Sequence, residues 1–441
     1  MDEKGNLAKH ILENRNIQSN PNERFSKFGL SFNPFPRAGI SDLNSPDHLV
    51  KKLLPVDEEV KRGVEEFIVD SLFPQNPNST DKYLSSVIRG DYGYGKTQTL
   101  LYAKFVLESF SDINDINKNP YVVYIDNPGA KLSELIGSIV YEIGEENFKR
   151  YLWNTAFEAI TSNKSFKEEL LAFKPANLSL FADDGLDPFN PVHLVNYKAF
   201  LDAFYKLLTP QKKKDFQNRL KEFIITTFSD EFESPTIALY FYNLISENIG
   251  INRTWEMLTS GSAKDLNKKE VFIIRAIFKV IESQGYTDFY ILVDEFEAVT
   301  AGRLGAKEID QYVMNLRALI DKERNWCSLF AMTGYALARL TSISPPLAER
   351  ISGRLIDLNR LNDERAKLIT LNYLNLAREE SDSIHPFDES GISELQSKSK
   401  GILRIYLKSC YTLLQRAVED LKEGEKINGD FVNKYFIVED E

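Results

Sequence analysis

Cysteine and histidine are scarce in this sequence, and their scarcity excludes two kinds of site. The 441 residues include two cysteines, Cys327 and Cys410, which are far apart and lie in apolar runs. Such cysteines are typical of core positions in a reducing compartment rather than of a disulfide framework. The four histidines are scattered and show no cysteine or histidine spacing that would hold zinc.

Long apolar runs are also missing. No stretch of about 18 or more apolar residues occurs, and the polar N-terminus has no signal-peptide pattern. We therefore expect a cytoplasmic protein that does not interact with a membrane. The net charge of −11 argues against a general nucleic-acid coat but leaves a local basic patch open. A hydrophobic content of 43% indicates a folded globular chain, and the length suggests two or three domains.

Glycine, by contrast, is concentrated in one short stretch. Residues 90–97 read Gly-Asp-Tyr-Gly-Tyr-Gly-Lys-Thr, the G-x-x-x-x-G-K-T pattern of a phosphate-binding P-loop. The glycines let backbone N–H groups approach phosphate oxygens, Lys96 can reach the β- and γ-phosphates, and the Thr97 hydroxyl can bind Mg²⁺. The predicted nucleotide contacts are Gly90, Asp91, Tyr92, Gly93, Tyr94, Gly95, Lys96, Thr97 and Gln98.

The flanking sequence favours this interpretation over a simple glycine-rich turn. The stretch Tyr-Leu-Ser-Ser-Val-Ile at 83–88 predicts a short buried strand before the loop, and helical spacing at 97–107 predicts a helix after it. The phosphates would then lie at the N-terminus of that helix, where unpaired backbone N–H groups bind anions.

A second candidate site follows the apolar run 289–293, which predicts a strand ending at Asp294 and Glu295. An aspartate at the end of a buried strand next to a P-loop strand can hold Mg²⁺, directly or through water. A glutamate directly after it can polarise a water for attack on the γ-phosphate. The alternative is a strand that ends in an ordinary charged turn, and the P-loop favours the magnesium interpretation.

Four further residues are candidates with open alternatives. Thr333 ends the apolar run 328–332, where it can sense the γ-phosphate or simply form a turn with Gly334. Arg350 and Arg354 precede a short predicted strand, and either can be an arginine finger or an ordinary surface residue. Arg404 lies in the first turn of a predicted helix, where the helix dipole disfavours a cation, so contact with phosphate is a separate reason for it.

The order of predicted elements indicates the fold class. Strands alternate with helices, as at 121–125 and 132–143, which predicts an α/β fold with a parallel sheet flanked by helices. Only helical patterns occur at 148–269, which we interpret as a helical insertion that is either a partner surface or scaffold. The predicted parts are a mobile arm or short helix (1–24), a nucleotide-binding α/β domain (25–359) that begins with an extended segment pinned to the core, and a helical lid (360–441).

This order of parts resembles the AAA+ ATPases over about residues 30–436, apart from the insertion. Within that class, Tyr92–Thr97 and Tyr290–Glu297 resemble the origin-recognition and initiator branch and the ATP-binding proteins of BREX-type phage-defence systems. Gly29–Phe35 is similar to the entry segment of transposition and secretion ATPases. The resemblance implies ATP and Mg²⁺ as cofactors, metal at Thr97 and Asp294, a catalytic base at Glu295, and sensor residues at Thr333 and Arg404.

The sequence departs from that class in three ways. The first sensor is often asparagine, where this chain has Thr333. No recognisable winged-helix module follows the lid, which argues against DNA binding by the usual initiator route. The insertion has no identifiable counterpart.

The function expected first is that of an ATP-hydrolysing, oligomerising switch or motor subunit. DNA is a candidate partner, in mobile-element or phage-defence processes. One alternative is a slow signalling or scaffold ATPase whose insertion at 148–269 binds a protein partner. Another is a small-molecule kinase, which the long lid and the large insertion disfavour.

Overall fold

The computed structural model describes residues 21–38, 57–76, 81–113, 116–173, 189, 195–206, 208–259, 263–300, 304–379 and 381–436. Most of the N-terminal arm predicted for 1–24 lies outside these ranges. Within them, no helix is both long and apolar enough to cross a membrane.

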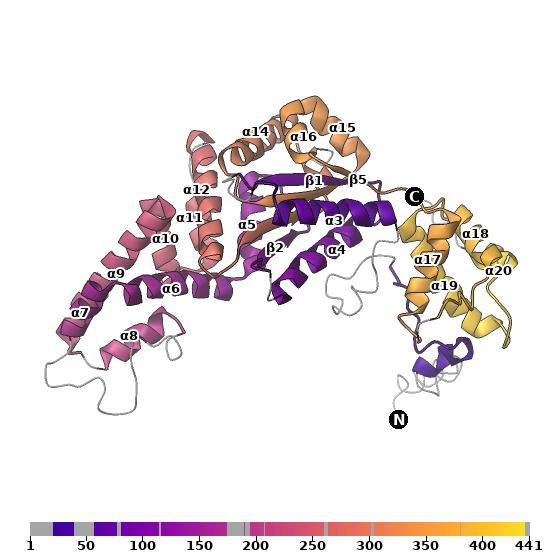
Figure 1. Cartoon of the computed structure of the whole chain (residues 1–441), viewed down its shortest axis with the longest axis horizontal. Coiled ribbons are helices and arrows are strands. Elements are labelled where there is room, and N and C mark those ends of the chain that lie inside the picture. The colour runs from indigo at the N-terminus through magenta and orange to yellow at the C-terminus, as the bar shows by residue number, and fades with distance from the viewer. Residues whose placement is uncertain are drawn as a thin grey trace, which may run out of the picture.

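A sheet of five parallel strands forms the centre of the molecule (Figure 1). The strands are β1 (Leu84–Arg89), β2 (Pro120–Ile125), β3 (Asp288–Val293), β4 (Cys327–Met332) and β5 (Leu355–Asp357). Their spatial order is β2-β3-β4-β1-β5, so the strand before the P-loop lies between β4 and β5. Because parallel strands end at the same edge, the residues that follow β1, β3 and β4 are brought together.

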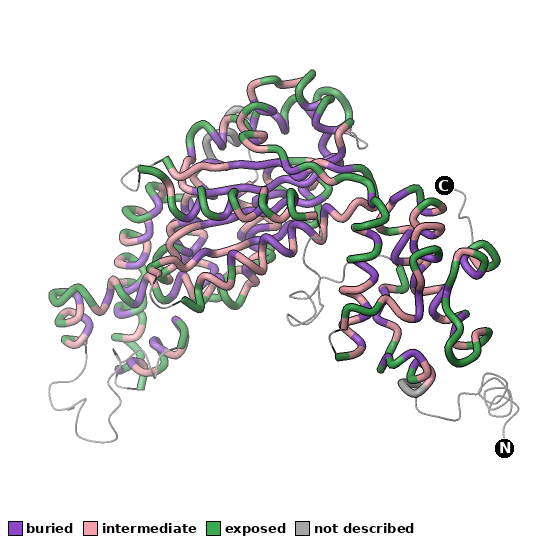
Figure 2. Tube along the Cα trace, turned by 45° about the vertical axis from the view of Figure 1, so that its right-hand side comes forward, coloured by how far each residue is buried: buried purple, intermediate pink, exposed green. Residues whose placement is uncertain are grey.

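Both faces of the sheet are covered by helices, as the side-chain alternation of a strand requires. Ile88 and Leu292 face one cluster, which α3 (Glu58–Leu72) and α4 (Lys96–Ser109) complete. Their chain neighbours Val87 and Ile291 face the opposite cluster. On that side pack α5 (Leu132–Ile143), α12 (Ala263–Glu282), α13 (Glu297–Thr300), α14 (Ala306–Lys322), α15 (Gly334–Ile343) and α16 (Pro345–Ile351). Figure 2 shows the buried strands running through the middle.

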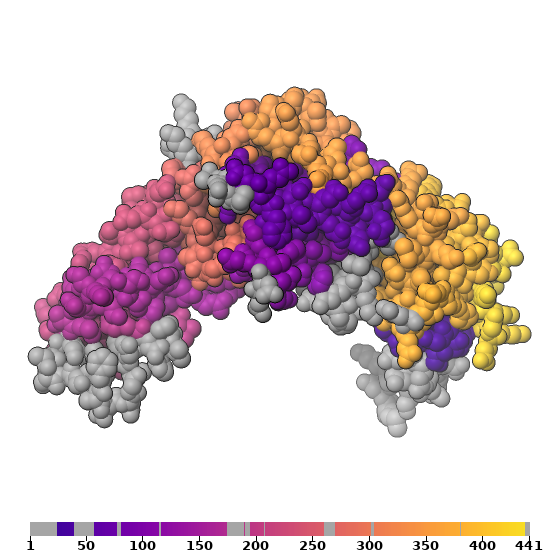
Figure 3. Space-filling view, in the orientation of Figure 1, coloured from indigo at the N-terminus to yellow at the C-terminus, as the bar shows by residue number. Residues whose placement is uncertain are grey.

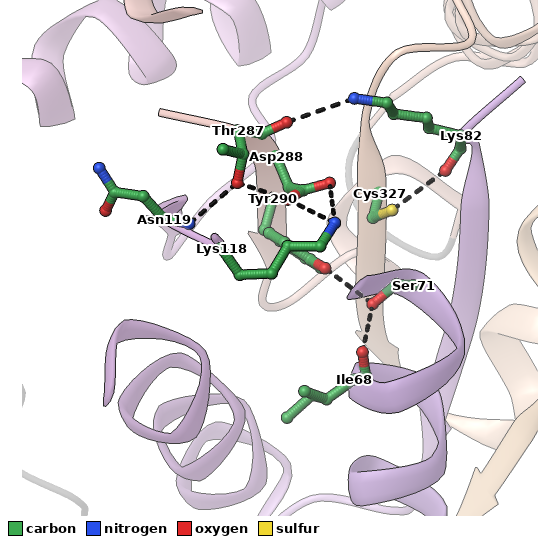
Figure 4. A network of polar contacts seen from close by, with 9 residues as sticks. All are labelled: Ile68, Ser71, Lys82, Lys118, Asn119, Thr287, Asp288, Tyr290 and Cys327. Atoms are coloured by element: carbon green, nitrogen blue, oxygen red, sulfur yellow. Dashed lines mark hydrogen bonds and ion pairs between the residues drawn. The ribbon is translucent and has the colours of Figure 1, made fainter. Parts of the chain in front are cut away.

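A polar network fixes the sheet at the edge opposite the P-loop (Figure 4). Lys118 Nζ lies 3.2 Å from Asp288 Oδ2, and the hydroxyl groups of Ser71 and Tyr290 are 2.8 Å apart. The Asn119 N–H donates to Thr287 Oγ1 at 2.9 Å. These contacts hold the starts of β2 and β3 in register and attach α3 to the sheet, so they stabilise the scaffold rather than the candidate site.

The insertion forms a helical arm, which we define as α6 to α11. Its helices are α6 (Glu145–Ser162), α7 (Lys164–Ala172), α8 (Tyr197–Tyr205), α9 (Pro210–Phe232), α10 (Pro235–Ile245) and α11 (Ile251–Thr259). The described part of the arm contains no strand, as the sequence predicts. In Figure 3 the arm and the C-terminal helices extend from opposite sides of the sheet body, which gives the molecule an arched outline.

The arm and the sheet share one apolar core. Aromatic side chains such as Trp153, Phe200 and Phe241 belong to the same buried cluster as the sheet residue Val123. At the base of the arm, a Cβ atom on Gly137 of α5 would lie 2.7 Å from Trp255 Nε1 of α11. Only glycine therefore permits this close packing of α11 on α5.

The C-terminal helices form a lid with a separate core. These helices are α17 (Asp363–Leu374), α18 (Glu389–Lys398), α19 (Leu403–Asp420) and α20 (Gly429–Tyr435). Their buried cluster also takes in the N-terminal segment, which we define as residues 21–36. The Ser31 N–H, for example, donates to the Ala377 carbonyl at 2.8 Å. The predicted domain boundaries assign residues 25–36 of this segment to the sheet domain, whereas its buried side chains pack against the lid.

The prediction that an extended segment begins at residue 25 is wrong for residues 25–28. Pro21–Phe28 forms a 3-10 helix, η1. Phe25 and Phe28 are both buried in the lid cluster. A helix of about three residues per turn brings side chains three positions apart onto one side. Burial of this phenylalanine pair therefore favours the helix over an extended chain.

The side chain of Glu270, on α12, is buried. Its Oε2 atom has no hydrogen-bond partner among the described residues. Burial raises its pKa from the ordinary value of 4.5 to about 7. An unfolded chain releases this proton at lower pH than the folded protein does. The folded state therefore loses stability as the pH rises from 4.5 to about 7, by about 3 kcal/mol in total.

Replacing Glu270 with glutamine is expected to remove this penalty. The Tm should rise above that of the wild type at about pH 8 and change little at about pH 4.5, where the native carboxyl is already protonated. Thermal denaturation across this pH range measures the difference. Glu282→Gln, at an exposed position of the same helix, is the matched control. An equal rise in Tm at both pH values would contradict the raised pKa of Glu270.

Candidate functional site

The P-loop turns from β1 into α4 through backbone conformations that favour glycine. Gly93 and Gly95 have φ angles of 79° and 98°, in the left-handed region. α4 begins at Lys96, whose ammonium group turns back and donates to the Gly90 carbonyl at 3.0 Å. The predicted strand, glycine-rich loop and helix are all present, so the order that a P-loop requires is confirmed.

The lid closes directly onto this loop. The Arg404 N–H donates to the Gly93 carbonyl at 3.0 Å. A Cβ atom on Gly93 would lie 2.9 Å from Ile402 Cγ2 and 3.0 Å from Arg404 Cβ. Glycine at position 93 therefore permits both the left-handed backbone turn and the close approach of the lid. The exposed Arg404 side chain lines the cavity beside the loop and forms no ion pair with any described residue.

Thr97 and Asp294 are far apart in sequence but meet at the edge of the sheet. The Thr97 hydroxyl donates to Asp294 Oδ2 at 2.6 Å, and the Tyr124 hydroxyl donates to the same oxygen at 2.9 Å. Asp294 Oδ1 accepts from the Glu295 N–H at 2.8 Å. Burial, and then the charge of Asp294, raise the pKa of the Tyr124 hydroxyl, so this group remains a donor at neutral pH. These contacts fix the Asp294 carboxylate toward Thr97.

Glu295 is held in an uncommon backbone conformation. Its φ angle is 48°, in the left-handed region, which costs a residue other than glycine roughly 1–2 kcal/mol. Its side chain is exposed and lines the cavity beside Lys96 and Thr97. Such strain is often retained at functional sites, and here it accompanies the turn that follows Asp294.

Glu297 is a site residue to which the sequence analysis gave no role. Its carboxylate lies 3.5 Å from Lys96 Nζ, and the two side chains are only 7% and 8% exposed. Burial raises the pKa of Glu297, while the positive charge of Lys96 opposes this rise. Neither carboxylate oxygen has a hydrogen-bond partner among the described residues. The one available signal was the second acidic residue in Asp-Glu-Phe-Glu at 294–297.

These side chains surround a cavity of about 180 Å³ between the P-loop and the lid. A neighbouring cavity of about 100 Å³ has mainly apolar walls, which include Leu358 and Ile369. The residues that line both cavities are Gly95, Gln98, Tyr373, Leu403 and Leu407. Because their linings overlap, the two cavities form adjoining parts of one cleft. Its second part, and the contribution of the lid residue Tyr373, were not predicted.

The P-loop residues differ in how they face this cleft. Tyr92 and Tyr94 line the first and second cavities, respectively, and the Lys96 ammonium lies 5.1 Å from the centre of the Tyr92 ring. The Tyr94 hydroxyl accepts from Arg360 Nε at 2.7 Å. The Asp91 side chain is exposed and lines neither cavity, so the loop brings together most but not all of the predicted contacts.

Three other predicted residues lie outside the cavity linings. Thr333 directly follows β4, and its hydroxyl caps α15 by accepting from the Ala336 N–H at 3.1 Å. Arg350 forms an ion pair with Asp321. Arg354 contacts two carboxylates of α3, with Nη1 3.3 Å from Glu66 and Nη2 3.0 Å from Asp70. The side chains of both arginines are thus held by carboxylates of their own chain.

The donor set at the cleft fits Mg²⁺. Magnesium in nucleotide sites is held by one or two protein oxygens, with phosphates and water completing its octahedron. Thr97 and Asp294 provide a hydroxyl and a carboxylate oxygen 2.6 Å apart at the cavity wall. The described residues contain no group of three or more metal-binding His, Cys, Asp or Glu side chains, which a site of this kind does not require.

The structure agrees with the fold class that the sequence predicts. The predicted α/β fold is confirmed: a parallel P-loop sheet flanked by helices, with a helical insertion and a helical C-terminal part. No protein-family model and no curated protein matches the chain.

Two solved structures from Aeropyrum pernix are similar to it at low identity. The ORC1 protein in complex with DNA is 9% identical, with a TM-score of 0.41 over 87% of this chain and 68% of that one. The ORC2 protein, in ADPNP–ADP complexes, is 12% identical, with a TM-score of 0.40 over 86% of this chain and 66% of that one. These values are too low to carry a conclusion about activity.

Proposed function

We propose that the protein is an AAA+ ATPase that binds ATP with Mg²⁺ and hydrolyses it to ADP and phosphate. The observation that carries the proposal is the 2.6 Å contact between the Thr97 hydroxyl and Asp294 Oδ2, at the wall of the cavity that Lys96 also lines. The contact joins a P-loop hydroxyl to a strand-end carboxylate, and this pair of groups is needed to bind the metal of a nucleotide.

The cleft indicates how the nucleotide would lie. The first cavity is lined by Lys96, Thr97 and Arg404, which suits a phosphate tail. The second cavity continues from it between apolar residues of the body and the lid, and suits the base and ribose. An ATP molecule would therefore contact the P-loop and the lid at once, and its binding would favour their closed arrangement.

Each residue at the cleft has a separate proposed role in hydrolysis. Lys96 and Arg404 bind the phosphate oxygens, and Glu295 accepts a proton from the attacking water. Thr97 and Asp294 would hold Mg²⁺, which neutralises phosphate charge. We propose Thr333 as a sensor, because its hydroxyl accepts the cap contact from Ala336 and can still donate its own proton to a phosphate or a water. An arginine-finger role for Arg350 or Arg354 would require the side chain to leave its carboxylate partners.

Phosphate release from ATP, measured in the steady state with and without double-stranded DNA, tests the proposal. The wild type is expected to release phosphate faster than Glu295→Gln, which serves as the blank for contaminating ATPases. Release no faster than this blank contradicts ATP hydrolysis. Stimulation by DNA supports the proposal of a DNA-related switch or motor, including one in mobile-element or phage-defence processes.

Indifference to DNA favours the second candidate, a slower ATPase with a protein partner on the arm. The observation behind it is the protruding helical arm, which lies on the opposite side of the sheet from the C-terminal helices (Figure 1). We also propose that ATP promotes oligomer formation. Sedimentation velocity with and without ATP, over a wide range of protein concentration, should show larger species with ATP.

A further inference from the structure

We propose that Glu297 is a positioning residue that acts through Lys96: it competes with phosphate for the Lys96 ammonium and so weakens ATP binding and promotes nucleotide release. This inference rests on the proposed function. It goes beyond the assignment of Lys96 as a phosphate ligand, because it gives that ligand an acidic competitor within the same cavity.

The geometry of the pair carries the inference. Glu297 begins α13, directly after the turn that Glu295 makes, and its carboxylate lines the cavity instead of facing solvent. It lies 3.5 Å from Lys96 Nζ, and the ammonium group also donates to the Gly90 carbonyl at 3.0 Å. Neither carboxylate oxygen has a hydrogen-bond partner among the described residues. Lys96 is thus the closest compensation that this buried carboxylate has.

The charge of the cavity explains why this pairing would oppose ATP. The charged residues of its lining are three carboxylates, Asp294, Glu295 and Glu297, and two cations, Lys96 and Arg404, so −3 and +2 give a net charge of −1. A phosphate tail that takes Lys96 leaves Glu297 without its counter-charge and close to further negative charge. A buried carboxylate without a counter-charge raises the free energy of the complex, so ATP binding becomes weaker.

Glu297 differs from Glu295 in each of these respects. Glu295 is exposed, and no contact joins it to Lys96. Water screens an exposed carboxylate, so its charge affects a bound phosphate less than a buried charge does. The two acids of this short segment therefore have separable effects, with Glu295 acting on turnover and Glu297 on affinity.

The test compares the wild type, Glu297→Gln and Glu297→Asp. The probe is ATP with Mg²⁺, and its Kd is measured by competition with a fluorescent ATP analogue. Glu297→Gln is expected to bind ATP about tenfold more tightly, because the neutral amide does not compete for Lys96. Glu297→Asp keeps the charge but withdraws it by one methylene, so an intermediate gain of two- to threefold is expected.

The thermal shift on adding ATP distinguishes this role from a merely structural one. Glu297→Gln should lower the Tm of the free protein and increase the rise in Tm that saturating ATP causes. A structural role would lower both Tm values equally and leave the shift unchanged. The inference is overturned if both variants bind ATP as tightly as the wild type or more weakly. It is also overturned if Glu297→Gln loses ATP turnover while its affinity for ATP stays that of the wild type. If Glu297→Gln does not fold, the affinity of Glu297→Asp decides.

The failure of the proposed function gives a different result. If the wild type neither binds the ATP analogue nor shows a thermal shift with ATP, the nucleotide site itself is refuted. If the wild type binds and the two variants bind no more tightly, only the role of Glu297 is refuted.

Discussion

Replacing Lys96 with alanine is expected to weaken ATP binding by about 100-fold or more. Its side chain is only 8% exposed and lines the cavity beside Thr97, so little water is present to compensate a phosphate for the lost charge. Truncating one member of a buried charge pair typically costs about 2–5 kcal/mol, and about 1.4 kcal/mol corresponds to a tenfold change in affinity. The Kd for ATP with Mg²⁺, from calorimetry or from competition with a fluorescent analogue, measures the loss.

This variant needs a stability control, because Lys96→Ala also removes the counter-charge of Glu297. The double variant Lys96→Ala, Glu297→Gln removes both charges, so it should recover stability without recovering ATP binding. Lys104→Ala, on the same helix, is the matched control for loss of a lysine, because Lys104 lies outside the cavity linings and pairs with Glu108. Binding by Lys96→Ala within a few-fold of the wild type would refute the P-loop assignment.

Replacing Glu295 with glutamine should reduce ATP turnover by about 10²- to 10⁴-fold, the usual contribution of a general base, while ATP affinity stays close to that of the wild type. The reason for unchanged affinity is structural. The Glu295 side chain is exposed and takes no part in the contact between Thr97 and Asp294, whereas its own N–H, which the substitution retains, supports Asp294. Single-turnover phosphate release at saturating ATP measures the loss.

Glu349→Gln is the matched control, since it changes an exposed glutamate of α16 that lies outside both cavities. Equal turnover in the wild type and Glu295→Gln would refute the assignment of the base. A comparable loss in Glu297→Gln, with Glu295→Gln still active, would transfer the base to Glu297.

The parts of the site that could be predicted from sequence are those that local pattern determines. The P-loop has fixed spacing, and a strand of continuous apolar residues ending in Asp294 marks its own position along the chain. Parallel pairing then brings Asp294 to the edge where Thr97 lies, so even this long-range contact follows from the fold class. The strong helices of the insertion and the lid were predicted for the same reason, because an apolar periodicity is visible within one segment.

The remaining contacts depend on how separate segments pack. Glu297 faces Lys96 just after the left-handed backbone conformation of Glu295, which the sequence does not display. Tyr373 reaches the cleft from the lid, and Phe35 of the N-terminal segment stacks on it, with ring centres 5.5 Å apart. Such partners are distant along the chain, and no periodicity within one segment indicates that they meet.

The shared core of the arm and the sheet has a mechanical consequence. Close-packed interiors do not deform gradually, and an arm that shares its aromatic core with the sheet cannot swing without opening that core. The lid has a core of its own, so it can rotate as a unit with its interior intact. If the proposed function is correct, ATP-dependent movement at the cleft would rotate the lid as a unit, while the arm would keep its orientation on the sheet.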